Sequence, residues 1–239
     1  VLDAMGQLFY SLSIAMGIMV TYGSYMKKDA NLVKSVNQIE IFDTGIALLA
    51  GMMIIPAVYA FSGTEGMSAG PGLMFITLPK VFASLGAFGE FIGLIFFVMV
   101  LFAALTSAIS ILEAITSSVM DKFKWSRKKA TLIMAASTFV ISILVCLGYN
   151  VFYFDLKFPT GAVGQILDVL DYASNNILMP IVGLLTCILI GWVVKPKTTI
   201  EEITLNGEKF SRKTLYVVMI KVVAPILLFI ILLTGLGVI

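Results

Sequence analysis

Six long apolar segments constrain the fold of this 239-residue chain more than any other feature. About 20 helical residues cross the hydrocarbon core of a bilayer, and each segment reaches that length. The segments span residues 4–26, 40–62, 88–121, 128–149, 170–194 and 214–239. Only 13% of the residues are charged, about half the share in a soluble domain. The sequence therefore predicts a single all-α transmembrane domain with about six membrane helices.

Charge in the connecting loops sets an orientation for these helices. Lysine and arginine gather after the first, third and fifth segments, whereas the alternate loops contain only Lys80 and Lys157. By the positive-inside rule the first group is cytoplasmic, and the chain starts outside. The outer loop, residues 63–87, has a helical apolar pattern between Leu73 and Leu85. That pattern fits either a cap over an outward-facing vestibule or a helix lying at the membrane interface.

Composition argues against several function classes. The chain has no histidine, so imidazole metal sites and His-based catalytic triads are excluded, and no nucleophile–base pair suggests an enzyme. Cys146 and Cys187 lie in apolar runs, where buried free thiols are expected. The formal net charge is +2, and no basic run is long enough for a nucleic-acid partner.

The middle of the first segment carries small and hydroxyl residues: Ser11, Ser13, Ala15 and Gly17. Such residues weaken a helix and allow its backbone to unwind. An unwound turn at membrane depth frees carbonyl and N–H groups that need polar partners. The stretch therefore predicts either a binding site at a helix break or a seam where two helices pack closely.

Two further sets of polar residues lie at membrane depth. Ala103, Thr106 and Ser107 have the spacing of one helical face. Their oxygens could bind a desolvated Na⁺, or the hydroxyls could bond back to their own helix. Asp43, near the start of the second segment, needs a cation, a proton or a helix N-terminus as partner. Glu113, inside the third segment, needs a polar contact that the sequence does not identify.

Five short motifs together resemble the neurotransmitter:sodium symporter family, which has a LeuT-type inverted-repeat fold. They are Gly6–Ser13, Thr21–Tyr25, Phe75–Pro79, Phe102–Ser107 and Ser126–Lys128. The resemblance covers helices six to eleven of such a transporter, the first of these being discontinuous. It implies an incomplete fold whose partners include the missing N-terminal helices, among them the first broken helix.

The resemblance also assigns roles to individual residues. It implies two Na⁺ sites, each shared with the missing first helix, one using Ser11 and Asp43 and the other using the Ala103 carbonyl with Thr106 and Ser107. The implied substrate-binding residues are Tyr10, Ser13, Ala15, Met16, Ser107 and Ile111. The implied gate residues are Asp171 on the outer side and Asp121 with Tyr25 on the inner side. Ala47 occupies the position of the chloride-binding serine of animal members, so chloride dependence is not expected.

These expectations define one function and one alternative. The chain is expected to belong to a multi-pass protein of a bacterial inner membrane that moves a neutral amino acid with Na⁺ by alternating access. Tyr10, Met16 and Ile111 provide an apolar wall that favours a hydrophobic or aromatic substrate. The alternative is an ion channel or amino-acid sensor that binds the same ligands without transport.

Overall fold

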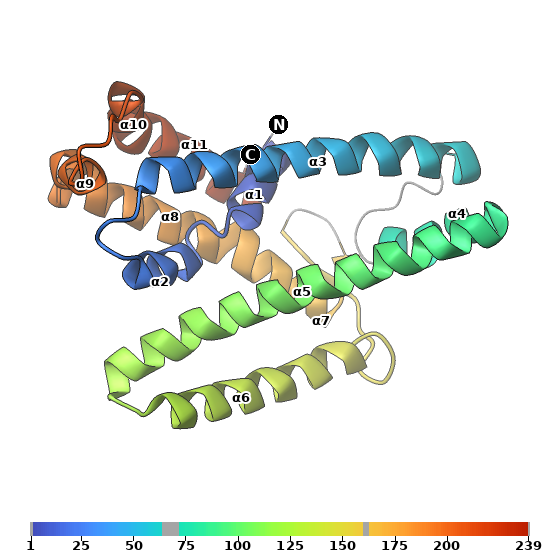
Figure 1. Cartoon of the computed structure of the whole chain (residues 1–239). Coiled ribbons are helices and arrows are strands. Elements are labelled where there is room, and N and C mark those ends of the chain that lie inside the picture. Colours follow the sequence, from blue (N-terminus) through green and yellow to red (C-terminus); the bar gives the residue numbers. More distant parts are fainter. Residues whose placement is uncertain (1, 64–71, 160–162, 239) are drawn as a thin grey trace. The chain divides into compact units, whose positions relative to one another are not determined.

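The computed structural model describes residues 2–63, 72–159 and 163–238, which are almost entirely helical (Figure 1). Within these ranges, five helices are long and apolar enough to cross a membrane. They run Leu32–Phe61, Gly86–Phe123, Arg127–Leu147, Ile166–Val193 and Lys213–Gly235. The prediction of an all-α membrane protein is confirmed. The chain divides into two units, one of residues 37–110 and one of residues 1–36 with 111–239.

The first apolar segment is a broken helix, as predicted. Helix α1 (Leu2–Ser11) and helix α2 (Ile18–Tyr25) are joined by residues 12–17, which are not helical (Figure 1). Each half is too short to cross a bilayer alone, because about 20 helical residues are needed. The break therefore lies in the middle of an apolar stretch, where its backbone polar groups are costly to leave without partners.

The remaining helices extend beyond or subdivide the predicted segments. Helix α3 (Leu32–Ser62) begins well before residue 40, while α5 (Gly86–Phe123) and α6 (Arg127–Leu147) end within two residues of the predicted bounds. Residues 166–193 form one continuous span that alternates α-helical and π-helical turns. Its parts are α7 (Ile166–Asp171), η2 (Tyr172–Leu178), α8 (Met179–Ile188) and η3 (Leu189–Val193).

The last span alternates in the same way. It consists of α10 (Lys213–Val218), the π-helical η4 (Met219–Val223) and α11 (Ala224–Gly235). The short helix α9 (Pro196–Ile203) lies between the last two spans, and a small antiparallel pair joins β1 (Leu156–Lys157) to β2 (Val163–Gly164). The sequence indicated neither α9 nor the two strands.

In the unit of residues 37–110, the predicted outer loop contains η1 (Leu73–Thr77) and α4 (Leu78–Ser84). Residues 64–71 of that loop lie outside the described residues. The ring of Phe82 packs against Phe96 and Phe97 of α5, with centroids 5.5 and 6.3 Å apart. A Cβ atom on Gly93 would lie 3.1 Å from the Phe82 ring, so this glycine makes room for the contact. The helical part of the loop is therefore packed on α5.

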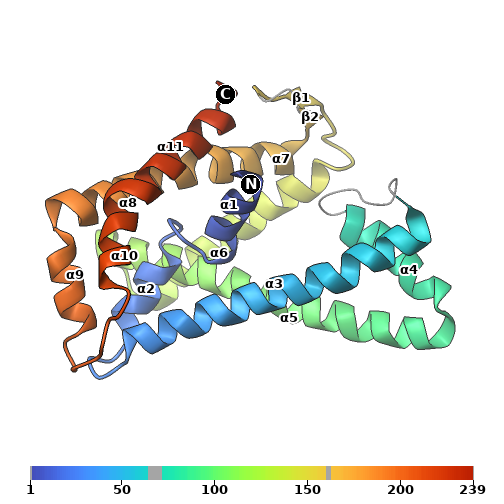
Figure 2. The same ribbon diagram turned by 90° about the horizontal axis from the view of Figure 1, so that it is seen from above.

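In the other unit, α8 and α11 lie side by side (Figures 1 and 2). Gly183 allows this close approach, and Gly235 allows the end of α11 to approach η2, as small residues do between membrane helices. A Cβ atom on Gly183 would lie 3.1 Å from Leu228 Cδ1, and one on Gly235 would lie 2.5 Å from the Asn176 carbonyl oxygen. The Tyr172 hydroxyl donates to the carbonyl of Gly235, which ties η2 to the end of α11.

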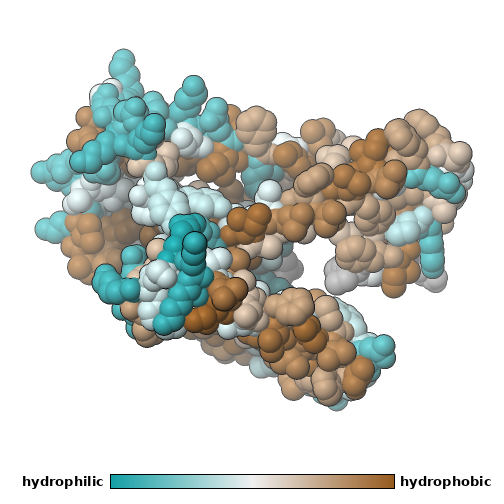
Figure 3. All heavy atoms as spheres, turned by 60° about the horizontal axis from the view of Figure 1, so that its bottom comes forward, coloured by the Kyte–Doolittle hydropathy of each residue, from teal (hydrophilic) through white to brown (hydrophobic). Residues whose placement is uncertain are grey.

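Apolar side chains cover most of the surface of the spans. Only 6% of the most apolar window is buried in four of the five spans, compared with 28% in Ile166–Val193. Figure 3 shows hydrophobic residues over much of one face, with hydrophilic residues gathered mainly on the side that carries α9 and α10. Exposed apolar surface of this extent is typical of segments that face lipid or a further protein partner. The exposure therefore supports a membrane location for these helices.

Candidate functional site

The break between α1 and α2 is held in an irregular backbone conformation. Ser13, Ala15 and Gly17 have φ angles of 53°, 65° and 78°. Positive φ disfavours residues with a Cβ atom, and a right-handed helix excludes it. These are three of the four small residues that the sequence indicates as weak points. The break is therefore encoded locally by residues that tolerate, or can be held in, a left-handed conformation.

At the break, the sequence separation between backbone donor and acceptor changes, and the helical hydrogen-bond pattern is then interrupted. Leu12 N–H donates to the Leu8 carbonyl in the α-helical pattern at 3.0 Å, whereas Ile14 N–H reaches back to Phe9 at 2.9 Å. Among the described residues, the next backbone bond joins Thr21 N–H to the Gly17 carbonyl at 3.0 Å. The intervening amide and carbonyl groups are left outside the helical ladder, where they can bind a ligand or an ion.

The start of α2 is anchored by buried side chains. Ile18 is 5% exposed and Thr21 is 8% exposed. The Thr21 hydroxyl donates to the Gly17 carbonyl at 3.0 Å, so this carbonyl accepts two bonds from the same residue. Gly17 is thereby fixed as the point where helical structure resumes. Residues 12–16 before it form a short irregular segment between the two helical halves.

The predicted substrate residues of this segment have different surroundings. Tyr10 is near the end of α1 and about half exposed, and Ser11 is the last residue of α1. Ala15 and its neighbour Ile14 line an apolar cavity of about 260 Å³ against α8 and η4. Ser13 and Met16 are half-buried. The described lining of the cavity contains no charged side chain, so the cavity beside the break is mainly apolar.

On α5, Ala103, Thr106 and Ser107 lie on one face, as their spacing predicts. The Thr106 hydroxyl donates to the carbonyls of Phe102 and Ala103 at 3.1 and 2.9 Å. This is the bonding within the helix that the sequence left open as the alternative to an ion site. A donating hydroxyl keeps its oxygen lone pairs, so the Thr106 oxygen can still act as a ligand. Ile111 follows one turn later and is 44% exposed.

Asp43 does not cap its helix, and that alternative is wrong. Helix α3 begins at Leu32, about three turns before Asp43. The favourable field of a helix N-terminus falls off within the first turn. Asp43 is half-buried in the middle of a helix and has an interaction partner. The partner of this carboxylate is therefore something other than the start of α3.

The predicted outer-gate residue, Asp171, has a hydrogen-bond partner within its own span. Asp171 accepts a hydrogen bond from Asn175 Nδ2 at 2.6 Å, within the same span. Asp168, closer to the start of that span, accepts the Gln165 N–H at 2.8 Å and so acts as an ordinary N-terminal cap partner.

At the other end of this unit, Glu113 joins three helices. Its carboxylate accepts the Tyr25 hydroxyl at 2.6 Å and Arg127 Nη2 at 2.6 Å. The Glu113 side chain is 17% exposed, compared with 61% for Arg127. Asp121, the predicted inner-gate acid, lies about two turns further along α5. The sequence indicated that Glu113 needs a contact but gave no sign that Tyr25 provides it.

Comparison with known proteins places this geometry among related transporters. The profile of the family described as "Sodium:neurotransmitter symporter family" matches residues 1–238. An uncharacterized sodium-dependent transporter of Haemophilus influenzae is 36% identical over 97% of this chain and 49% of its own length. One from Bacillus subtilis is 32% identical over 100% of this chain and 51% of its own length.

A solved structure is similar over the same extent. The crystal structure of MhsT in complex with L-phenylalanine has a TM-score of 0.86 and 33% sequence identity, and the match covers 98% of this chain and 51% of that chain. The chain thus spans about half the length of the relatives it matches. The match covers nearly all residues of both units.

Proposed function

The chain belongs to the sodium:neurotransmitter symporter family, and on that premise we propose that it takes part in Na⁺-coupled symport of a neutral amino acid. The substrate is hydrophobic or aromatic, and transport proceeds by alternating access in the inner membrane of a bacterium. The observation that carries this proposal is the break at residues 12–17. It interrupts the helical hydrogen-bond ladder at the centre of an apolar span, in a sequence related to sodium-dependent transporters.

The break supplies the chemistry that an amino-acid substrate requires. The carboxylate and ammonium groups of an amino acid need hydrogen-bond donors and acceptors in a site that excludes water. Backbone N–H and C=O groups at broken helices meet that need in transporters. The Tyr10, Ser13, Ala15, Met16, Ser107 and Ile111 side chains form our proposed substrate wall. The phenylalanine bound to MhsT supports an aromatic substrate as the first one to test.

The proposed sodium ligands are oxygen atoms, which suit a hard cation. Ser11 and Asp43 serve one ion, and the Ala103 carbonyl with the Thr106 and Ser107 hydroxyls serves another. We propose that the remaining ligands come from the part of such a protein that this chain does not span. The half-buried position of Asp43, away from a helix terminus, supports an ionic partner for its carboxylate.

The charge of Asp43 also bears on chloride. A carboxylate beside a sodium ion supplies the negative charge that would otherwise come from a bound anion. Ala47, in the same helix, has no hydroxyl to bind chloride. We therefore propose transport that does not depend on chloride. Asp171 is proposed as the outer gate, and Tyr25 with Asp121 as the inner gate.

Uptake into vesicles tests this function. The protein is reconstituted at its full encoded length and given radiolabelled L-phenylalanine with an inward Na⁺ gradient or with matched K⁺. We expect saturable accumulation with Na⁺ only, unchanged when gluconate replaces chloride. Sodium-dependent binding without accumulation would instead identify a sensor, and a sodium current that is independent of amino-acid flux would identify a channel.

A further inference from the structure

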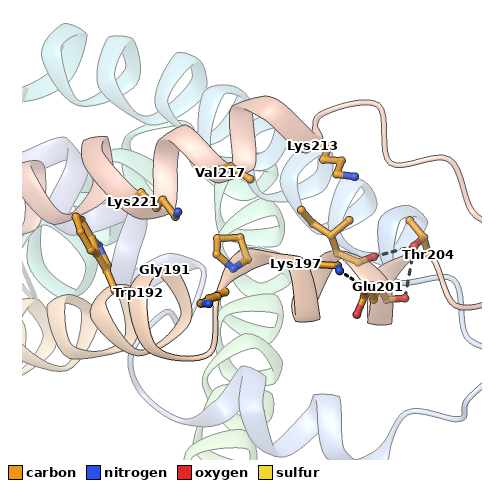
Figure 4. Close-up of a pocket in the computed structure, with 11 residues that line it drawn as sticks. Gly191, Trp192, Lys197, Glu201, Thr204, Lys213, Val217 and Lys221 are labelled. Carbon is orange, nitrogen blue, oxygen red and sulfur yellow. Dashed lines mark hydrogen bonds and ion pairs between the residues drawn. The ribbon is translucent and has the colours of Figure 1, made fainter.

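A basic pocket lies between the last two spans, apart from the helix break. It has a volume of about 550 Å³, and its walls come from η3, α9, α10 and η4. Figure 4 shows Lys213, Val217 and Lys221 along one helix, with Trp192, Lys197 and Glu201 on the facing segments. All the lining residues belong to the same unit of the chain. The pocket has no part in the proposed sodium or substrate sites.

Positive charge dominates this pocket. Lys195, Lys197, Lys213 and Lys221 line it, together with Glu201 as the one carboxylate among its described lining residues. Lys197 Nζ lies 3.7 Å from Glu201 Oε1, which neutralises one of the four ammonium groups. The other three like charges face a shared space, and like charges around one cavity repel each other unless an anion is bound. The pocket is therefore electrostatically suited to an anion.

Backbone geometry brings the lysines to the walls of one pocket. Lys213, Val217 and Lys221 follow one another at four-residue intervals, and the π-helical η4 holds Lys221. Opposite them, Gly191 lets η3 approach closely, because its Cβ atom would lie 3.2 Å from the Ile220 carbonyl oxygen. Lys195 has a φ of 72°, unusual for a residue with a Cβ atom, and it turns the chain sharply into α9.

The position of the pocket at one end of two membrane spans indicates which class of anion it suits. Trp192 and Lys221 lie inside spans, Lys213 is the first residue of the last span, and Lys195 lies two residues after the end of the preceding span. Tryptophan is typical of the membrane–water interface, and a lysine within a span extends its ammonium toward that interface. The positive-inside rule assigns this end to the cytoplasm. Basic pockets between membrane helices on that side suit anionic headgroups.

We propose that this pocket binds the phosphate headgroup of an anionic phospholipid from the cytoplasmic leaflet. Lys213 and Lys221 contact the phosphate, and Lys195 approaches it from the opposite wall. Trp192 and Val217 provide apolar surface for the glycerol and the first acyl carbons. A phospholipid is favoured over a soluble phosphate because the charged groups and the apolar wall adjoin at the edge of two membrane spans.

Binding of headgroup-labelled phosphatidylglycerol to the full-length protein in neutral detergent micelles tests this site. The variant Lys213→Gln with Lys221→Gln is compared with Lys27→Gln and Lys28→Gln, which removes the same charge from another cytoplasmic loop. Each lysine near an anionic lipid surface contributes about fivefold in affinity. The pocket variant should therefore bind about 25-fold more weakly, while the control variant should stay within about twofold of the unmodified protein.

Two further variants and a competition experiment distinguish a lipid site from general surface charge and from a soluble-anion site. Lys213→Arg with Lys221→Arg keeps both charges and should retain binding, and Lys213→Gln alone should weaken binding about fivefold even if the double variant fails to fold. Equal loss in the pocket and control variants would overturn the proposal, because binding would then reflect general surface charge. Competition by millimolar inorganic phosphate but not by phosphatidylglycerol vesicles would assign the pocket to a soluble anion and would also overturn it.

Discussion

Replacing Glu113 by alanine should destabilise the protein by about 2 kcal/mol, mainly through the lost bond to Tyr25. The carboxylate accepts one bond from Tyr25 and one from Arg127, both at 2.6 Å. Because the Arg127 side chain is 61% exposed, water and salt screen that ion pair, and it should contribute little to stability. The Glu113 side chain is only 17% exposed, so its bond to the Tyr25 hydroxyl should contribute more, about 1.5–2 kcal/mol.

Double-mutant cycles measure these two contributions separately. The free energy of unfolding is determined in mixed micelles for Glu113→Ala, Tyr25→Phe and Arg127→Met, alone and in pairs. We expect a coupling energy of about 1.5–2 kcal/mol between Tyr25 and Glu113, and a clearly smaller one between Arg127 and Glu113. Added salt should reduce only the second value. Glu113→Gln, which keeps an acceptor for Tyr25, should cost about 1 kcal/mol.

A matched control lies on the same helix. Glu90 is an exposed carboxylate in α5, and Glu90→Gln should change stability by less than about 0.5 kcal/mol. The reasoning is refuted if the Arg127 coupling exceeds the Tyr25 coupling, or if both couplings are below about 0.3 kcal/mol. Either result would mean that exposure does not rank these two contacts.

Three further predictions concern packing, sodium and orientation. Gly235→Ala should cost about 1–3 kcal/mol in unfolding free energy because the new Cβ atom meets a backbone carbonyl. Gly23→Ala places its Cβ atom where nothing lies within 4 Å, so it should be neutral or stabilising. Equal effects of the two substitutions would contradict the packing. Asp43→Asn should raise the Na⁺ concentration needed for half-maximal substrate binding, and an unchanged midpoint would remove Asp43 from the sodium ligands. A cysteine at Lys80 should react with an impermeant reagent on intact cells and one at Lys128 should not, and the reverse pattern would invert the orientation.

The membrane helices and the break could be predicted because both are local properties of the sequence. Long apolar runs specify spans without reference to any distant residue. Ser13, Ala15 and Gly17, small or hydroxyl residues in the middle of the first segment, are the positions where φ becomes positive. The start of α3 was missed because Lys34, Asn37 and Glu40 are polar. Hydropathy marks the part of a helix that lies in lipid, whereas the helix itself continues into water.

Other features depend on contacts between distant parts of the chain. Tyr25 and Glu113 are separated by 88 residues, so no spacing rule connects them. The π-helical turns η3 and η4 have no composition of their own, and Gly191 shows its importance only where a second helix passes close to it. The four pocket lysines were visible in the sequence as loop charge and as the isolated Lys221. Only the fold brings them around one cavity.

The most direct test of sodium-coupled symport is a paired flux measurement on one set of vesicles containing the full-length protein. Radiolabelled Na⁺ and L-phenylalanine are followed together, starting from a gradient of only one of them. The account predicts that each gradient drives the other solute uphill, and that both fluxes fall together in Asp43→Asn. Phenylalanine movement that leaves Na⁺ at equilibrium, or Na⁺ movement unaffected by phenylalanine, would contradict coupling at the broken helix.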